Sequence, residues 1–176
     1  MPTLIHTRLD VPERHPAVTA LSELETSHGV AWVAAVELDG HRVGTFENEG
    51  HGGATCFIPH DTGVYSIRDF ERFAASCTRD DAPISAEHVM ELLVEEYDST
   101  VMTRDVRGHA GTYARQVADG WTVDYAEVPQ WPRTPQERAR LARLLNEQYP
   151  PPPDLTVTWE VWTGQAWQPL PGPPHD

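Results

Sequence analysis

The stretch Val33–Pro59, VAAVELDGHRVGTFENEGHGGATCFIP, decides how the front of the chain is expected to fold. Apolar residues alternate up to Leu38, which is the period-2 pattern of a strand with one buried face. Asp39-Gly40 then predicts a type I′ hairpin turn, because both residues tolerate the positive φ angles of that turn. The chain is expected to return as a strand through Arg42–Glu47 and to form another at Ala54–Ile58. The stretch therefore predicts an antiparallel meander.

Strand and helix signals continue on both sides of this meander. Before it, Thr3–Val11 and Ala17–Glu25 are predicted strands. After it, Ser66 and Ser85 are expected to cap two helices, and Asp69 completes a capping box with Ser66. The remaining expected elements are strands at Tyr113–Val117 and Trp121–Val128, a helix that begins at Thr134, and a strand at Leu155–Trp162 that turns back at Thr163-Gly164. The whole pattern predicts an α+β fold: an antiparallel β-meander with two to three helices packed on one face and a C-terminal β-hairpin.

Four consecutive prolines set the expected domain organisation. Pro150–Pro153 favour the extended polyproline conformation, which makes a stiff linker. We therefore expect a single α+β domain over residues 1–149, a proline linker over 150–154, a terminal hairpin over 155–168 and a flexible tail over 169–176.

Charge limits the class of partner. The 176 residues include 27 acidic and 13 basic side chains, which gives a net charge of −14 with histidine neutral, and every basic residue counted is arginine. This charge repels phosphate backbones and anionic lipids, so we expect a protein partner rather than nucleic acid or a membrane. Cys56 and Cys77 show no paired spacing, and we expect no signal peptide, because the first residues carry charges and no long apolar run. These features predict a cytoplasmic protein with reduced cysteines.

A glycine-rich loop is the candidate functional site. It consists of Asn48, Glu49, Gly50, His51, Gly52 and Gly53. Three glycines this close together allow several N–H groups to point into one concavity, so a nucleotide or anion binder that uses Gly50–Gly53 is one alternative. The loop joins two strands and contains neither G-x-G-x-x-G nor G-x-x-x-x-G-K-[ST]. Those absences favour a glycine-rich bulge between strands.

The same region carries side chains suited to zinc. The four candidate ligands are His51, Cys56, His60 and Asp61. A zinc ion held there would activate a water for attack on an ester or phosphoester, which makes a metal-assisted hydrolase a second alternative. Their spacing matches no zinc signature, and the simpler expectation is a protein with no cofactor. Alternation also places Cys56 on one face with Ala54 and Ile58, which indicates a buried cysteine.

An acidic stripe on the expected second helix is a candidate partner surface. The stripe consists of Glu87, Glu91, Glu95 and Asp98. Like charges four residues apart repel by about 0.2–0.5 kcal/mol per pair, so another group is expected to offset them. Two candidates remain open: the arginines of the last helix, or a basic partner. Those arginines are Arg133, Arg138, Arg140 and Arg143.

The terminal hairpin is a second candidate partner surface. The strand period places Trp159 and Trp162 on opposite faces, so at least one of them is expected to be exposed. Exposed aromatic side chains next to a proline linker are typical of docking elements, which makes Trp162 and Trp167 candidate docking residues. The alternative is an edge hairpin packed over the sheet.

Two motifs carry a resemblance to other proteins. Residues 39–44 read D-G-H-R-V-G and residues 48–53 read N-E-G-H-G-G. This resembles a pattern, D-G-x-x-V-G followed by N-D-G-H-G-G, of small uncharacterised bacterial, plasmid and phage proteins, with Glu49 where Asp is usual. The resemblance is specific over roughly twenty residues. It implies an accessory role in mobile-element biology and no particular chemistry.

The favoured function is that of a small acidic interaction or regulatory accessory protein. The charge, the acidic stripe and the terminal aromatic residues all favour a protein partner. Whether the chain is an enzyme stays open, because the hydrolase and the anion binder both rest on one loop.

Overall fold

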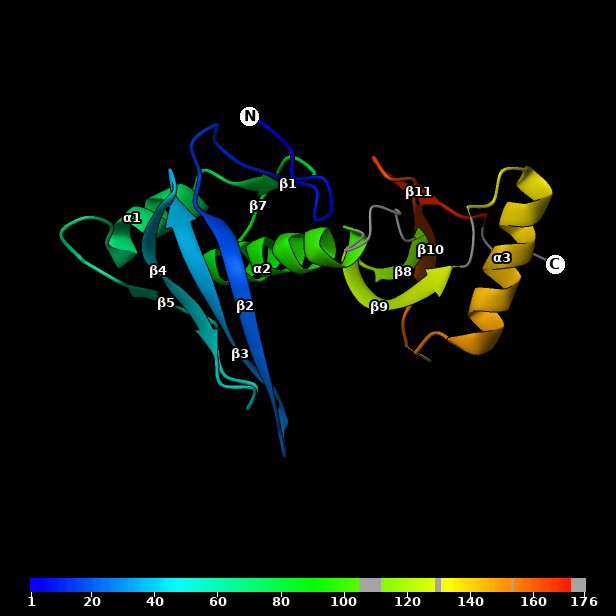
Figure 1. Ribbon diagram of the computed structural model, residues 1–176, viewed down its shortest axis with the longest axis horizontal. Helices are drawn as coiled ribbons and strands as arrows, with labels where there is room; N and C mark the ends of the chain where they lie inside the picture. Colours follow the sequence, from blue (N-terminus) through cyan, green and yellow to red (C-terminus); the bar gives the residue numbers. More distant parts are fainter. Residues whose placement is uncertain (105–111, 129–130, 153, 172–176) are drawn as a thin grey trace. The chain divides into compact units, whose positions relative to one another are not determined.

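The computed structural model describes residues 1–104, 112–128, 131–152 and 154–171 (Figure 1). The chain divides into two compact units, Met1–Val101 and Met102–Asp176. This division differs from the expected single domain over residues 1–149. No helix in the described ranges is long and apolar enough to cross a membrane.

A four-stranded antiparallel sheet in the order β2-β3-β4-β5 forms the framework of the first unit. Its strands are β2 (Ala17–Thr26), β3 (Gly29–Leu38), β4 (His41–Asn48) and β5 (Cys56–Pro59). The other elements are the helices α1 (Ile67–Ala74) and α2 (Ala86–Thr103), and the short strands β1 (Leu9–Asp10), β6 (Thr78–Arg79) and β7 (Ala82–Pro83) of a second sheet. Asp39 and Gly40 have φ angles of +54° and +77°, as the type I′ turn requires. The predicted meander is confirmed.

Phenylalanine side chains on one face of this sheet form the core. Phe46 and Phe57 are cross-strand partners on β4 and β5, and both are buried. On α1, the ring of Phe70 has its centroid 5.2 Å from each of theirs, so α1 lies on this face. The buried Thr55 precedes Phe57 by two residues and hydrogen-bonds to α2, which places α2 on the same face. Both helices of the first unit therefore cover one face of its sheet.

The face of β5 that packs against the core is not the expected one. Ala54, Cys56 and Ile58 are exposed, whereas Thr55 and Phe57 are buried. The prediction of a buried Cys56 is therefore wrong. Because Phe57 has far more apolar area to remove from water than a cysteine has, it decides which face of the strand turns inward.

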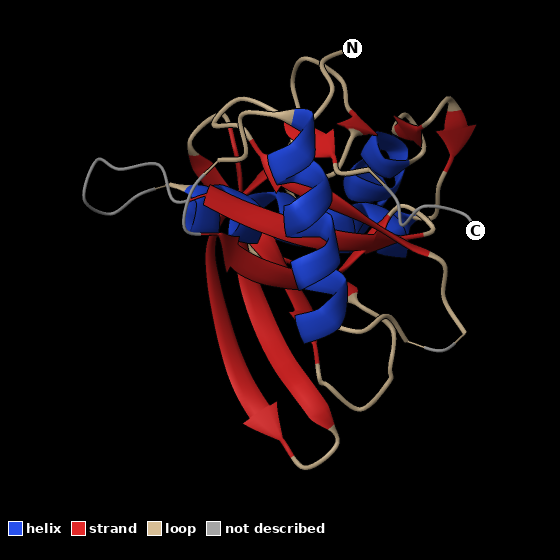
Figure 2. Cartoon of the chain, turned by 90° about the vertical axis from the view of Figure 1, so that its right-hand side faces the viewer, coloured by secondary structure: helices blue, strands red, loops and turns tan. Residues whose placement is uncertain are grey.

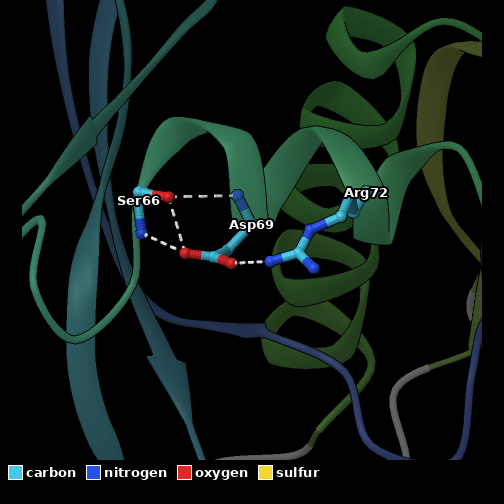
Figure 3. A network of polar contacts seen from close by, with 3 residues as sticks. All are labelled: Ser66, Asp69 and Arg72. Carbon is cyan, nitrogen blue, oxygen red and sulfur yellow. Dashed lines mark hydrogen bonds and ion pairs between the residues drawn. The ribbon is translucent and has the colours of Figure 1, made fainter.

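A capping box begins α1, as predicted (Figure 3). The Ser66 N–H and hydroxyl donate to Asp69 Oδ2 at 2.8 Å and 2.6 Å, and the Asp69 N–H donates to Ser66 Oγ at 3.3 Å. Arg72 adds an ion pair to the same carboxylate. The Ser66 hydroxyl and N–H, followed by Arg72, lower the pKa of Asp69 to about 2. These contacts lie within seven residues, which is why the sequence predicts this helix start.

Tyr65 carries a buried hydroxyl with no hydrogen-bond partner in the described ranges. Burial, followed by the nearby Asp69 charge, raises the pKa of Tyr65 to about 12. An unsatisfied buried polar group costs about 1–3 kcal/mol. We therefore expect Tyr65→Phe to raise the free energy of unfolding by about 1 kcal/mol, measured by urea denaturation followed by circular dichroism. A loss of stability would instead show that the hydroxyl has a partner.

The segment Thr3–Val11 is not the strand that its pattern predicts, because β1 covers only two of its residues. The backbone N–H groups of Ile5, His6 and Thr7 converge on the carboxylate of Glu96 in α2, with donor–acceptor distances of 2.9–3.1 Å. A contact between residues about 90 positions apart is invisible to a local hydrophobic pattern. The turn around Glu96 replaces most of the predicted strand.

In its described residues, the second unit is a four-stranded antiparallel sheet, in the order β11-β10-β8-β9, covered by one helix. Its elements are β8 (Thr112–Ala118), β9 (Trp121–Val128), α3 (Pro135–Gln148), β10 (Val157–Trp162) and β11 (Trp167–Pro169). The terminal hairpin is present, but β10 pairs with β8 and lies inside the sheet, which corrects the expectation of an appended hairpin. Trp159 and Val161 of β10 share a buried core with Leu145 of α3, which crosses this sheet in Figure 2. Burial of this apolar core explains why the hairpin belongs to the second unit.

The other face of this second sheet carries a buried ion pair. Arg115 and Glu160 are cross-strand partners on β8 and β10. The Arg115 Nε and Nη2 donate to Glu160 Oε2 at 2.9 Å and 2.7 Å, and the guanidinium lies 4.4 Å from the ring centroid of Trp167. The pair belongs to the framework of the unit, since its charges are removed from solvent.

Candidate functional site

The side chain of Asn48 organises the glycine-rich loop. Its Oδ1 accepts the N–H of Gly50 at 2.8 Å, and its Nδ2 donates to the Gly53 carbonyl at 3.3 Å and to Thr55 Oγ1 at 3.1 Å. The loop thus closes tightly between β4 and β5. One of the N–H groups expected to bind an anion, that of Gly50, is already bonded within the loop.

The loop also braces the β2–β3 hairpin. A Cβ atom at Gly50 would lie 2.6 Å from backbone atoms of Val30 and Ala31, so the two backbones touch. The exposed His51 has its ring centroid 5.2 Å from that of His28 in the β2–β3 turn, with the two rings edge to face. The loop is therefore a support for the hairpin.

Glycine at position 50 is required by this contact. Gly50→Ala is expected to lower the free energy of unfolding for two reasons. The φ of +71° costs a residue with a side chain about 1–3 kcal/mol, and the clash of the new Cβ with Val30 adds a further loss. Gly52→Ala is the matched control, since its φ is +76° but the space around it is open. Urea denaturation followed by circular dichroism measures both losses. Equal losses would contradict a close approach of the two backbones.

Thr55 connects the loop to the acidic stripe of α2. Its N–H donates to Glu87 Oε1 at 3.0 Å, and its hydroxyl donates to Glu91 Oε1 at 3.4 Å. Burial raises the pKa of Glu91, and the charge of Glu87 adds to the effect. The contacts show that these two carboxylates hold the loop connection against α2.

Two residues of the stripe are engaged inside the first unit, by a group that neither expected explanation includes. Glu87, Glu91 and Glu95 are half-buried, and Asp98 is exposed. In the second unit, Arg138 lies 5.3 Å from the ring centroid of Trp131 and hydrogen-bonds to Gln168. For Glu87 and Glu91, the offsetting groups belong to Thr55, so this half of the stripe is not an open partner surface.

The candidate zinc ligands are held apart by β5. Cys56 begins the strand and His60 follows its end, which separates their Cα atoms by about 13 Å at ~3.3 Å per residue. His51 contacts the β2–β3 turn, and Asp61 accepts the N–H of Gly63 at 2.8 Å. Within the described ranges, no group of three or more His, Cys, Asp or Glu side chains is close enough to hold a metal ion. The arrangement does not assemble the proposed hydrolase centre.

The tryptophans of the terminal hairpin are all buried, which corrects the prediction that at least one is exposed. Trp159, Trp162 and Trp167 are 3%, 8% and 7% exposed. Trp159 belongs to the core beside α3, and the rings of Trp162 and Trp167 contact each other with a centroid distance of 5.2 Å. Both faces of this sheet carry buried side chains, so alternation does not bring either ring to the surface. Trp162 and Trp167 do not form an exposed docking element.

The face of the first sheet that points away from α1 and α2, here called the outer face, carries a group of apolar side chains, with Glu37 and Arg42 beside it at one end. It carries Ala20, Ser22, Leu24, Ala31, Val33, Ala35, Thr45, Glu47, Cys56 and Ile58. Leu24, Val33 and Ile58 are 69%, 44% and 48% exposed. The solvated face of an antiparallel sheet is usually polar, and a contiguous exposed apolar patch is typical of an interaction site.

The strand β2 adds an open edge to this surface. It pairs with β3 on one side, and the sheet ends there among the described residues. Figure 1 shows the β2–β3 hairpin extending past the ends of β4 and β5 in the same sheet. Alternation places Ala20, Ser22 and Leu24 on the outer face, whereas Glu23 and Glu25 lie on the opposite face and are exposed. The projecting strand therefore offers an apolar row and an acidic row.

Most of the net charge belongs to the same unit. Residues 1–101 contain 18 Asp and Glu residues against 6 arginines, a net charge of −12 with histidine neutral. Residues 102–176 contain 9 against 7, a net charge of −2. The outer face thus lies in a strongly acidic unit, which attracts basic groups.

No family model, curated protein or solved structure matches the chain. The resemblance carried by residues 39–44 and 48–53 therefore stays a prediction. Function is argued from the geometry of the first unit.

Sequence reasoning missed the outer face, although a signal is present. Val30–Val36 contains no polar residue, and such a run is typical of a strand covered on both faces. In the structure, Ala34 and Val36 face the core, whereas Val33 and Ala35 lie on the outer face. The alternation of Trp32, Ala34 and Val36 predicts the strand by itself and does not indicate that the residues between them form an uncovered apolar surface.

Proposed function

We propose that the chain is a small acidic protein-interaction protein with a regulatory or accessory role, and that it binds through the outer face of its first sheet. One observation carries the proposal: β3 has the apolar sequence of a strand covered on both faces, while Val33 of its outer side is 44% exposed. A protein that covers the outer face removes this apolar area from water. Binding of this kind requires no catalytic group.

The chemistry of the surface supports a protein as the partner. The charge of −12 on residues 1–101 opposes binding to nucleic-acid phosphates and to anionic lipids. The apolar residues Leu24, Val33 and Ile58 instead suit the apolar centre of a protein interface, and the surrounding acids suit a polar rim. A role in plasmid or phage biology is what the two motifs imply.

The proposal is tested by capture, followed by reconstitution. The full chain, expressed with a removable tag in cells that carry its gene, is crosslinked and its bound proteins are identified. We expect a captured protein that, once purified, binds the full chain with fixed stoichiometry in calorimetry. The affinity is expected to fall as salt rises, since charges assist the contact. If no captured protein rebinds in purified form, the proposal is wrong.

A further inference from the structure

We infer that the β2 edge accepts, as an added strand, a segment of a partner protein in which basic and apolar residues alternate. The inference rests on the proposed function and specifies the chemistry of its partner. It combines three observations in the first unit: an open strand edge, an apolar outer face and an acidic row on the other side of the same strand.

The open edge supplies backbone hydrogen bonds. In an antiparallel ladder, every second residue of an edge strand points its N–H and C=O groups away from its one partner strand. A bulge lies between Val18 and Ala20, and pairing with β3 is regular from Ala20 to Thr26. Long exposed edges of this kind pair with other chains, and strand addition is a recurring mode of peptide recognition. The segment Ala20–Thr26 is therefore the receiving edge.

The two faces of β2 determine the side chains of the added strand. Neighbouring residues of paired strands lie on the same face of a sheet. Apolar side chains of the added strand would extend the row of Ala20 and Leu24 and meet the outer face. The intervening side chains would lie beside Glu23 and Glu25, where arginine or lysine forms favourable cross-strand pairs. The matching sequence alternates basic and apolar residues.

A second copy of this chain does not fit the edge. When two β2 edges pair with their outer faces on the same side, Glu23 and Glu25 of one copy lie beside the same residues of the other, and like charges repel. When one copy is turned over, its acidic row lies beside Leu24 and Ala20, which removes carboxylates from water without a partner. Both arrangements also bring together two units of charge −12. Charge complementarity therefore favours a basic segment.

Two labelled peptides test the inference by fluorescence anisotropy with the full chain. The probe is a ten-residue peptide of alternating lysine and valine, and the control peptide alternates glutamate and valine. We expect the lysine peptide to bind and the glutamate peptide to bind at least about tenfold more weakly. Equal binding of the two peptides, or no binding of the lysine peptide, would overturn the inference.

Surface variants locate the binding site. Leu24→Lys and Val33→Lys each place a cation on the outer face, and each is expected to lower the affinity for the lysine peptide about tenfold. Val64→Lys is the matched control, because Val64 is 72% exposed and lies in the loop before α1, away from the outer face. Its affinity for the lysine peptide is expected to fall only by the small amount that one added positive charge anywhere on the protein causes. Thermal unfolding of each variant verifies that it is folded. If all three variants bind alike, the peptide binds elsewhere and the inference is wrong.

Two further measurements separate this inference from the proposed function. If a natural partner identified by capture binds Leu24→Lys and Val33→Lys more weakly than the unmodified chain but leaves the exchange of the Ala20–Thr26 amides unchanged, it covers the outer face without pairing with the edge. The inference is then wrong and the proposed function stands. Light scattering measures the mass of the unbound chain, for which we expect a monomer. A dimer that Leu24→Lys converts to monomers would identify a second copy as the occupant and overturn the inference.

Discussion

Glu160→Gln is expected to lower the free energy of unfolding of the second unit by about 3–5 kcal/mol, as removal of one partner of a buried ion pair does. The side chains of Arg115 and Glu160 are only 5% and 7% exposed. Arginine stays charged in proteins, so the variant removes the carboxylate to which Nε and Nη2 donate while the buried cation remains. Urea denaturation followed by tryptophan fluorescence measures this loss, because every tryptophan except Trp32 belongs to the second unit.

Two control variants show whether burial of the charges is the cause. Arg14→Gln breaks the exposed pair between Arg14 and Asp39, whose side chains are 72% and 55% exposed, and is expected to cost less than about 1 kcal/mol. The double variant Arg115→Met/Glu160→Leu removes both buried charges and is expected to recover most of the stability lost in Glu160→Gln. A loss in Glu160→Gln no larger than that in Arg14→Gln would contradict the account.

Glu96→Ala is expected to cost about 3 kcal/mol or more, because one carboxylate holds the N-terminal turn. The N–H groups of Ile5, His6 and Thr7 and the hydroxyl of Thr7 all donate to it, and His6 and Thr7 are buried. Buried donors left without an acceptor carry the full desolvation cost. Amide hydrogen exchange measured by NMR reports the contact directly, and we expect these three amides to lose protection in the variant.

Glu96→Gln and Glu71→Ala complete this experiment. Glutamine keeps one carbonyl oxygen as an acceptor but loses the charge. The free energy of unfolding of Glu96→Gln is therefore expected to lie between those of the alanine variant and the unmodified chain. Glu71 is exposed on α1, and its replacement by alanine is expected to change stability by less than about 0.5 kcal/mol. Unchanged exchange of the three amides in Glu96→Ala would show that the carboxylate does not hold the turn.

The features that the sequence predicts correctly are those set by neighbouring residues. The Asp39-Gly40 turn and the Ser66 capping box each depend on contacts within a few positions. The same holds for Thr134, whose capping box with Glu137 begins α3 and lowers the pKa of Glu137. Local chemistry is sufficient for these elements.

The features that the sequence does not predict depend on residues far away in the chain. The N-terminal turn requires Glu96, and the inward face of β5 depends on the ring of Phe70 as well as on Phe57. The terminal hairpin belongs to the second unit because β10 pairs with β8, across 45 positions between Arg115 and Glu160. A local pattern specifies a strand but not its neighbours, so neither the unit boundary nor the uncovered face of β3 follows from it.

Contacts between distant residues also explain why the structure of the candidate site differs from the one that the sequence predicts. The glycine-rich loop has a defined conformation, and its close approach to Val30 shows that it supports the β2–β3 hairpin. The metal hypothesis assumed that four side chains close in sequence converge, whereas an extended β5 separates Cys56 from His60. The outer face follows from the register of β3 with its neighbours, which places each apolar residue on one side of the sheet or the other.

Hydrogen exchange of the full chain with and without the peptide of alternating lysine and valine tests the central claim most directly. If the β2 edge accepts an added strand, amides of Ala20–Thr26 that face away from β3 gain partners and exchange more slowly in the complex. The amides of the loop around Val64, which bond to Asp61 within the loop, serve as an internal reference, and their exchange is expected not to change. Protection confined to α2, or no protection of Ala20–Thr26 at a peptide concentration that saturates binding, would contradict the account.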